Sequence, residues 1–275
     1  MRPVLHVLDL TKQARRFPIL KQLQIEEALF RADPRRRNWL IVNHGLPALP
    51  SGNSHAAIIF GLGDGKRPDS LCHVERARND GVSLVKRFSG GGTVYVDQGT
   101  VFLTFICNAN IALGNPLMTD PNTTLVYPRP IMEWTGLIYG GAFDRLLGCD
   151  HQFILQENDY VFGVKKFGGN AQSISKDRWV HHTSLLHEFD LDTMGKYLKL
   201  PNKQPEYRQD RGHDEFLCCL KDVLPLDAHM RSLTDAILEE LQAHWFVVED
   251  DLDYDAEEIE ELLASGEYRR GNVIL

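Results

Sequence analysis

Two short segments of this chain place glycines beside a basic side chain, a combination suited to binding an anion. The first, residues 86–100, reads KRFSGGGTVYVDQGT and carries Arg87 ahead of three consecutive glycines. Glycine lacks a Cβ atom, so it can adopt positive φ and let a ligand approach the backbone N–H groups. The guanidinium of Arg87 adds a forked donor for the same anion. Taken alone, the triplet predicts a structural turn about as well as an anion site, because it matches neither GxGxxG nor GxxxxGK[ST].

The second segment, residues 164–172, reads VKKFGGNAQ and is followed by VHHTSLL at residues 180–186. Adjacent side chains on a strand point to opposite faces, so only one of Lys165 and Lys166 can enter a pocket. A lysine ammonium is a compact charge that can bridge two anions, and neighbouring glycines allow close approach. Two such segments in one chain are what is needed to hold a carboxylate against a nucleotide phosphate.

The elements around these segments are predicted from apolar spacing. Short apolar runs closed by glycine or turn residues indicate strands within residues 4–8, 38–45, 55–65, 81–88 and 93–108. Residues 158–175 indicate a hairpin with its turn at Gly163. Three- and four-residue spacing predicts helices over residues 17–33, over 131–148, and from Leu226 to Trp245. We therefore expect an α+β fold in which a mixed, largely antiparallel β-sheet is flanked by helices.

The amino-acid composition indicates which kinds of partner and which cellular compartment to expect. The chain has 275 residues and a formal net charge of -8, which argues against nucleic acid as a partner because phosphate binding needs clustered Lys and Arg. No apolar run reaches the ~18 residues of a membrane-spanning helix, so no membrane partner is expected. Five cysteines without CxxC spacing predict reduced thiols and an intracellular reducing compartment, with mitochondrial and cytoplasmic locations both open.

Three stretches, RFSGGGTVYVDQGT, ENDYVFGVKKFGGNAQ and HHTSLL, together resemble the lipoate–protein ligase family, within the wider group of biotin and lipoate ligases and octanoyltransferases. The resemblance runs from near Ile25 to near Trp245, and YPRPIMEW and LKLPNKQPEYR make the chain most similar to single-domain ligase-like proteins of eukaryotes. It implies a biotin/lipoate ligase-like catalytic domain over residues 1–248 and an acidic C-terminal helix or tail over residues 249–275. It implies no separate accessory domain.

The resemblance also implies a two-step reaction. ATP, with Mg²⁺ bound to it, and lipoate would condense to lipoyl-AMP and pyrophosphate. The lipoyl group would then pass to a lysine of an acceptor domain in a 2-oxoacid dehydrogenase or glycine-cleavage protein. Cationic and N–H donors suit this chemistry because they stabilise charge as it develops. Without an accessory domain, an accessory subunit would be a further partner, or the protein would accept preformed lipoyl-AMP.

Carried over position by position, the resemblance makes Lys166 the catalytic residue, between the lipoate carboxylate and the α-phosphate. Arg87 would contact the phosphates, and His182 would lie beside the acyl pocket. Asn158 and Asp159 match a pair near the adenine. No residue is assigned to a metal. The other substrate- and nucleotide-binding positions, on the two glycine segments, are Ser89, Gly90, Gly91, Gly92, Thr93, Val94, Tyr95, Gly169, Asn170 and Ala171.

Some points in this assignment have alternatives. For His181 and His182, a hydrogen-bonded strand histidine is as good an interpretation as a ligand contact. Val96 and Thr100 depart from bacterial ligases, which usually have histidine and asparagine there, and GLGDG at residues 61–65 replaces the usual arginine- and glutamine-bearing turn.

Two other functions compete with the ligase. A transferase could move octanoyl or lipoyl groups from a preformed donor through a thiol nucleophile. Cys149 is the one candidate thiol, but LLGCDHQF lacks the expected partner motif, and we interpret all five cysteines as buried structural thiols. A non-catalytic binding protein of the same fold is the other alternative. The presence of Arg87, the glycine triplet and Lys166 argues against it.

Overall fold

An eight-stranded sheet forms the body of the molecule. The computed structural model describes residues 2–12, 18–46, 56–112, 127–201, 204–250, 261–265 and 271–275. The strand order is β11-β1-β2-β6-β10-β9-β8-β7; β1 runs parallel to β2 and β11, and the remaining pairs are antiparallel. The prediction of a mixed, largely antiparallel sheet is confirmed. The strands are β1 (Val4–Asp9), β2 (Trp39–His44), β6 (Thr100–Asn108), β7 (Phe153–Gln156), β8 (Asp159–Phe162), β9 (Lys165–Ile174), β10 (Arg178–Leu186) and β11 (Val247–Asp250).

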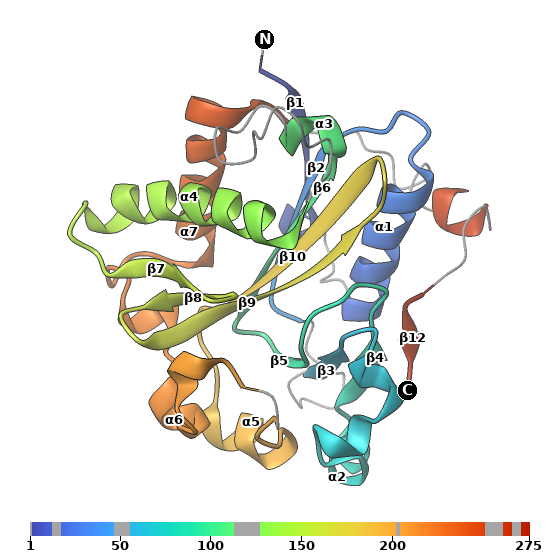
Figure 1. Ribbon diagram of the computed structural model, residues 1–275, viewed down its shortest axis with the longest axis vertical. Coiled ribbons are helices and arrows are strands. Elements are labelled where there is room, and N and C mark those ends of the chain that lie inside the picture. The colour runs from blue at the N-terminus through green and yellow to red at the C-terminus, as the bar shows by residue number, and fades with distance from the viewer. Residues whose placement is uncertain are drawn as a thin grey trace.

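A second, four-stranded sheet lies at one end of the first, below α1 in Figure 1. Its order is β12-β4-β3-β5. Here β3 and β4 are parallel, and the other two pairs are antiparallel. The strands are β3 (Ala57–Phe60), β4 (Ser83–Lys86), β5 (Val94–Val96) and β12 (Val273–Ile274). The glycine triplet therefore connects β4 to β5 within this small sheet.

Helices cover both faces of the large sheet (Figure 1). Helices α4 (Pro128–Leu147) and α7 (Met230–Glu240) lie on one face, and α1 (Ile19–Ala32) lies on the other. Helix α4 begins with proline, whose missing N–H costs nothing in the first turn, and ends at Gly148, which has a φ of +76°. Short helices complete the fold: α2 (Val74–Asn79), α3 (Ala109–Ala112), α5 (Leu191–Tyr197), α6 (His213–Phe216), and 3₁₀ turns at Leu10–Lys12, Asp64–Lys66, Pro68–Ser70, Glu206–Arg208 and Leu220–Asp222.

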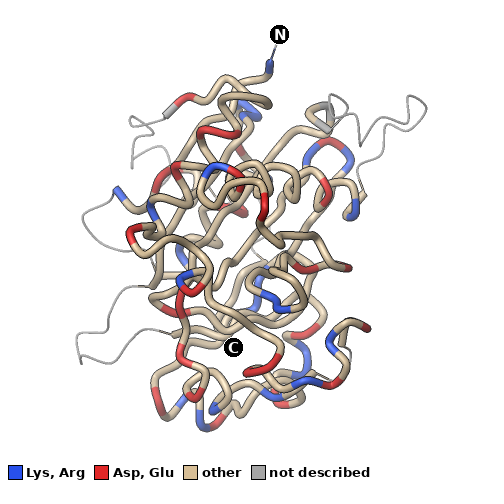
Figure 2. Tube along the Cα trace, turned by 90° about the vertical axis from the view of Figure 1, so that its left-hand side faces the viewer, with Lys and Arg blue, Asp and Glu red and all other residues tan. Residues whose placement is uncertain are grey.

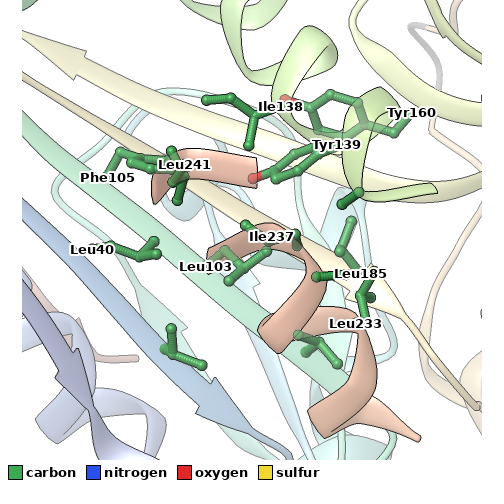
Figure 3. Close-up of a cluster of buried hydrophobic side chains, with 14 of the residues drawn as sticks. Leu40, Leu103, Phe105, Ile138, Tyr139, Tyr160, Leu185, Leu233, Ile237 and Leu241 are labelled. Carbon is green, nitrogen blue, oxygen red and sulfur yellow. The ribbon is translucent and has the colours of Figure 1, made fainter. Parts of the chain in front are cut away.

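The main core lies between the sheet and the α4–α7 layer. Figure 3 shows Leu103 and Phe105 of β6 among Tyr139 of α4, Ile237 of α7 and Leu241 of the turn that follows α7, all of them buried. Burying one large apolar side chain contributes ~1.5–3 kcal/mol, so this layer holds the sheet rigid. Helix α1 and the small sheet cover the opposite face of the large sheet.

The helix predicted from Leu226 to Trp245 is shorter than its apolar spacing indicated. Leu226 was expected on the buried face of a helix from 226 to 245, but the helix begins only at Met230 and Leu226 is fully exposed. His229 caps the helix by accepting from the backbone of Ser232, whose hydroxyl accepts from the His229 N–H. Such a cap fixes the helix start, so the expectation for residues 226–229 was wrong. After Glu240 the chain continues in a π-helical turn, Leu241–Trp245.

The described residues beyond β11 pack on the body of the molecule. Asn272 is buried, and its side chain accepts from the N–H of Phe88 (3.0 Å) and donates to the Leu23 carbonyl (2.8 Å). It also donates to the carboxylate of Glu27 at 2.8 Å. Most of the expected acidic tail lies outside the described residues, but residues 271–275 join α1 to the segment just before the glycine triplet.

Charged side chains of both signs are interspersed along the trace (Figure 2). Among the described residues, no helix combines the length and apolar character needed to cross a bilayer.

Candidate functional site

The glycine triplet is docked onto β9, so the two segments singled out in the sequence lie against each other. The N–H of Gly90 donates to the Gln172 carbonyl at 2.8 Å, and the N–H of Gln172 donates back at 3.3 Å. Gly91 has a φ of +113°, and a Cβ there would lie 2.9 Å from the Asn170 carbonyl oxygen. Only glycine combines this φ with so close an approach. The triplet and β9 therefore form one wall.

Arg87 supports this loop from beneath. Its side chain is buried, and its guanidinium donates to the carbonyls of Ile59 (3.3 Å), Gly90 (3.3 Å) and Gly92 (2.8 Å). Burial lowers the pKa of Arg87 to about 10, so the group still carries its charge at neutral pH. Because C=O and N–H point in opposite directions across a trans peptide, the N–H groups of Gly91 and Thr93 face away from the guanidinium.

A pocket opens between α1 and the sheet face next to this wall. It encloses about 430 Å³, counting the solvent at its mouth. Its apolar lining comes from α1, β3, β5 and β6, and its other side from β9 and β10. The lining residues are Ile19, Gln22, Leu23, Glu26, Ile59, Arg87, Val94, Phe102, Thr104, Gly169, Asn170, Ala171, His182, Thr183 and Ser184.

A buried polar cluster forms part of the pocket wall. The carboxylate of Glu26 on α1 accepts from Gln22 Nε2 at 2.9 Å and from Thr104 Oγ1 at 2.8 Å. His182 Nδ1 lies 3.1 Å from the second oxygen of the same carboxylate. Our sequence analysis missed Gln22 and Glu26. A signal that could have identified them is their spacing, because polar residues four positions apart lie on the same side of a helix, here within the largely apolar face of α1.

The two neighbouring histidines have different surroundings. His182 faces the pocket, whereas His181 points into the core beneath α4, where Nε2 lies 3.0 Å from the Tyr160 hydroxyl. Gln172 Nε2 lies 2.9 Å from His181 Nδ1. Complete burial lowers the pKa of His181 to about 3, so its ring is neutral. His181 is therefore a hydrogen-bonded histidine of the core. Of the two histidines, only His182 lines the pocket and is available to a ligand.

Lys166 stands at the edge of the pocket. Its Nζ lies 2.7 Å from Asp159 Oδ1, and the side chain passes over Gly169, where an added Cβ would be 3.5 Å from Nζ. Gly169 itself lines the pocket. Lys165 is exposed on the other face of β9, as strand alternation predicts. The site thus combines an apolar cavity, a close-packed glycine wall and one ammonium held by a carboxylate.

Comparison with known proteins identifies the family. A family model described as the lipoyl protein ligase A/B catalytic domain matches residues 19–242. The chain belongs to this family. It is 29% identical over 281 aligned positions to a Plasmodium falciparum (isolate 3D7) protein named inactive lipoate–protein ligase 2, covering 88% of this chain and 69% of that protein.

Solved ligase structures share the fold. One is a bipartite lipoate–protein ligase from Thermoplasma acidophilum, solved in a study of the ligase and its E2 lipoyl domain. It has a TM-score of 0.69 and 18% identity, covering 96% of this chain and 91% of that chain. Another is lipoate-protein ligase A bound with ATP, with a TM-score of 0.68 and 18% identity, covering 96% and 94%. These likenesses confirm the expected ligase-type architecture.

The remaining positions assigned from the family resemblance divide between the pocket and its supports. Val94, Asn170 and Ala171 line the pocket. Ser89 is fully buried beneath the loop, and Thr93 donates to Asp64 Oδ2 at 2.9 Å. Val94, Asn170 and Ala171 therefore belong to the cavity. Ser89 and Thr93 belong to the structure that supports the glycine loop.

Other assigned positions lie outside the pocket lining. Tyr95 faces away from the cavity, in a cluster where its ring stacks on Tyr197 at 6.2 Å between centroids. Gly92 is exposed, with open space where a Cβ would be. Asn158 is exposed at the turn before β8, and its carbonyl accepts from Asn170 Nδ2 at 2.6 Å.

The two departures from bacterial ligases have structural roles. Val96 packs in the apolar cluster that joins α1 to the small sheet. Thr100 Oγ1 accepts from the N–H of Asp97 at 3.1 Å.

Burial raises the pKa of four of the five thiols, those of Cys72, Cys107, Cys218 and Cys219. All five cysteines are free, but only Cys72 and Cys107 are buried; Cys149 is exposed, so the interpretation of all five as buried was wrong. Cys218 and Cys219 are half-buried, and burial raises the pKa of Cys218 to about 11. A thiol with a raised pKa is a poor nucleophile at neutral pH. In the described part of the chain, no three His, Cys, Asp or Glu side chains are grouped to hold a metal.

Proposed function

We propose that this protein is a lipoate–protein ligase, which activates lipoate with ATP and transfers the lipoyl group to a lysine of an acceptor lipoyl domain. The observation that supports this most is the position of Lys166: its Nζ lies next to Gly169, which lines the apolar pocket, although Lys166 itself is not a lining residue. An acyl chain in the pocket would gain ~0.8 kcal/mol for each buried CH₂ group. Its carboxylate would then meet the ammonium.

In the first step, a carboxylate oxygen of lipoate attacks the α-phosphorus of ATP. The bond from that phosphorus to the bridging oxygen breaks, and pyrophosphate leaves. In this proposal Lys166 balances the charges of the carboxylate and the α-phosphate together, and the contact with Asp159 orients its ammonium. The N–H groups that face away from Arg87 provide further donors for phosphate oxygens. Mg²⁺ would arrive with the triphosphate and neutralise part of its charge.

In the second step, the acceptor lysine attacks the carbonyl carbon of lipoyl-AMP. The amide bond forms, AMP leaves, and the amine loses a proton. The pocket keeps the acyl chain in place while the mixed anhydride reacts. The likeness to a ligase studied with its E2 lipoyl domain supports an acceptor of that kind.

A second candidate is transfer from preformed lipoyl-AMP without activation. The name of the P. falciparum relative, an inactive ligase, favours this candidate or a non-catalytic binding protein. Arg87 also favours it, because both terminal nitrogens of its guanidinium already donate to backbone carbonyls. The bipartite T. acidophilum ligase supports the idea of an accessory subunit for the activation step.

The test is to incubate the purified protein with ATP, Mg²⁺ and lipoate, with and without an acceptor lipoyl domain, and to measure pyrophosphate release and the mass of the acceptor. The ligase predicts both pyrophosphate and a lipoyl mass gain. Mass gain only when synthetic lipoyl-AMP is supplied would establish the transferase instead. Binding of lipoyl-AMP without either product would identify a binding protein.

A further inference from the structure

The carboxylate that holds Lys166 is itself held by a tyrosine from a distant segment. Asp159 Oδ1 lies 2.7 Å from Lys166 Nζ, and Asp159 Oδ2 accepts from the Tyr207 hydroxyl at 2.8 Å. Each oxygen of one carboxylate therefore has its own partner. Asp159 is buried and Lys166 is half-buried, so water competes poorly for either contact.

Tyr207 is itself fixed to the hairpin that carries Asp159 and Lys166. Its N–H donates to Glu157 Oε1 at 3.0 Å, in the turn before β8. Arg211 Nη2 donates to the Tyr207 carbonyl at 2.8 Å and to the Val164 carbonyl, in the turn between β8 and β9, at 3.1 Å. The Tyr207 ring also packs on Phe216, with centroids 5.2 Å apart. Backbone, ring and hydroxyl are thus all restrained.

The chain turns sharply just after Tyr207. Gln209 and Asp210 have φ values of +52° and +57°, in the left-handed region that side chains other than glycine seldom adopt. Two consecutive residues in that region turn the chain sharply, and such strain persists only where surrounding contacts hold it. Here Arg208 Nε and Arg211 Nε each donate to the other residue's carbonyl at 3.0 Å, which closes the turn.

The hydroxyl of Tyr207 is in the protonated state that a hydrogen-bond donor requires. Burial, followed by the nearby Asp159 charge, raises the pKa of Tyr207 above its ordinary value. The hydroxyl therefore keeps its proton and has one good acceptor, the Asp159 carboxylate. A hydrogen bond to a charged group is about twice as strong as one between neutral groups, so it fixes the carboxylate rotamer.

We propose that Tyr207 is a positioning residue that sets the orientation of the Lys166 ammonium through Asp159. Its catalytic consequence rests on the proposed function, because Lys166 matters for turnover only if the pocket activates an acyl group. The geometric claim, that the hydroxyl fixes the Asp159–Lys166 pair, concerns the folded chain alone. The two claims need separate measurements.

The first measurement is the steady-state kinetics of pyrophosphate release by Tyr207→Phe. Loss of one charge-assisted hydrogen bond should lower kcat about tenfold, with the KM for lipoate changed less than twofold, because the lost contact acts on the reacting end only. Tyr197→Phe is a matched control, since its hydroxyl donates to Asp80 Oδ2 at 2.9 Å, away from Lys166. Equal kcat in the two variants would overturn the catalytic part of the proposal.

The second measurement needs no turnover. Lysine amines are modified slowly with an acylating reagent, and the rates at Lys166 and Lys165 are followed by mass spectrometry. Releasing Asp159 should raise the Lys166 rate at least threefold in Tyr207→Phe, with Lys165 unchanged and both rates unchanged in Tyr197→Phe. Unaltered labelling of Lys166 would refute the positioning role. A faster Lys166 in a protein that releases no pyrophosphate would keep this role and reject the proposed function instead.

Discussion

The carbonyl oxygen of Gly91 would lie only 2.0 Å from a Cβ atom at position 61. Gly61 begins the GLGDG turn after β3, and Gly91 is the centre of the glycine triplet. The absence of one side chain therefore lets the turn support the loop from the side opposite to β9. No rotamer change can relieve such a contact, because the backbone fixes the position of a Cβ atom and the carbonyl oxygen belongs to the backbone.

Substituting Gly61→Ala should displace the glycine triplet. We expect a loss of at least tenfold in nucleotide affinity and a fall of ~1–3 kcal/mol in the free energy of unfolding, as overpacking produces. Gly63→Ala is the control, since a Cβ there meets nothing within 4 Å and the backbone is right-handed. That variant should be neutral or more stable by ~0.4–1 kcal/mol. Calorimetric ATP binding and urea unfolding measure both quantities; equal behaviour of the two variants would contradict the packing argument.

Lys166→Ala should abolish adenylate formation while the fold is retained. The variant leaves the carboxylate and the α-phosphate without the cation between them, so we expect pyrophosphate release to fall by more than ~100-fold, the scale of losing a preorganised electrostatic contact. Lys165→Ala is the neighbouring control and should stay within twofold. A Lys166→Ala variant with an unchanged rate would remove the lysine from the mechanism.

Asn272→Ala should destabilise the protein and loosen the glycine loop. It leaves the buried N–H of Phe88 without its acceptor and removes one donor from the Leu23 carbonyl. An unsatisfied buried group costs ~1–3 kcal/mol, so we expect a loss of that order or somewhat more in urea unfolding. Ile274→Ala, two residues later and 62% exposed, should change stability by less than ~0.5 kcal/mol. Equal losses in both variants would show that the strand, and not the asparagine, carries the contact.

His181 should make the protein sensitive to acid. The folded imidazole is neutral down to a pKa of about 3, whereas the unfolded ring takes up a proton near pH 6.5. Acid therefore favours unfolding, and between pH 6 and pH 4 this residue lowers the free energy of unfolding by ~1.4 kcal/mol per pH unit. His181→Gln should reduce that slope by one proton in urea unfolding across a pH series. A slope for His181→Gln equal to that of the parent protein would contradict this account.

Most of the fold was predictable because its signals are local. Apolar runs closed by turns marked the strands, and alternation along residues 158–175 placed Lys165 and Lys166 on opposite faces of β9. Leu226 shows the limit of periodicity, because the cap at His229 decides where the helix starts. A pattern of spacing contains no information on where a helix begins unless the cap is recognised.

The site was predictable only in part, because its contacts join segments far apart in sequence. The two glycine segments were found from their composition, but their docking depends on the close approach of Gly91 to β9. Arg87 was expected to face the phosphates, and nothing local showed that its guanidinium would support the loop. Tyr207 escaped notice altogether, since its partner Asp159 lies 48 positions earlier in the chain.

The hydrogen bonds that Asn272 makes with Phe88, Leu23 and Glu27 bear on the order in which the protein folds. Asn272 meets Phe88 across 184 positions of sequence, whereas β7 pairs with β8, β8 with β9 and β9 with β10, each with the next strand along the chain. Contacts between nearby segments form quickly, and those of high contact order form slowly because a long loop must close first. The meander that carries Lys166 can therefore assemble early, while the loop facing it takes its final shape only when residue 272 arrives, so ligand affinity should appear in the slowest folding phase.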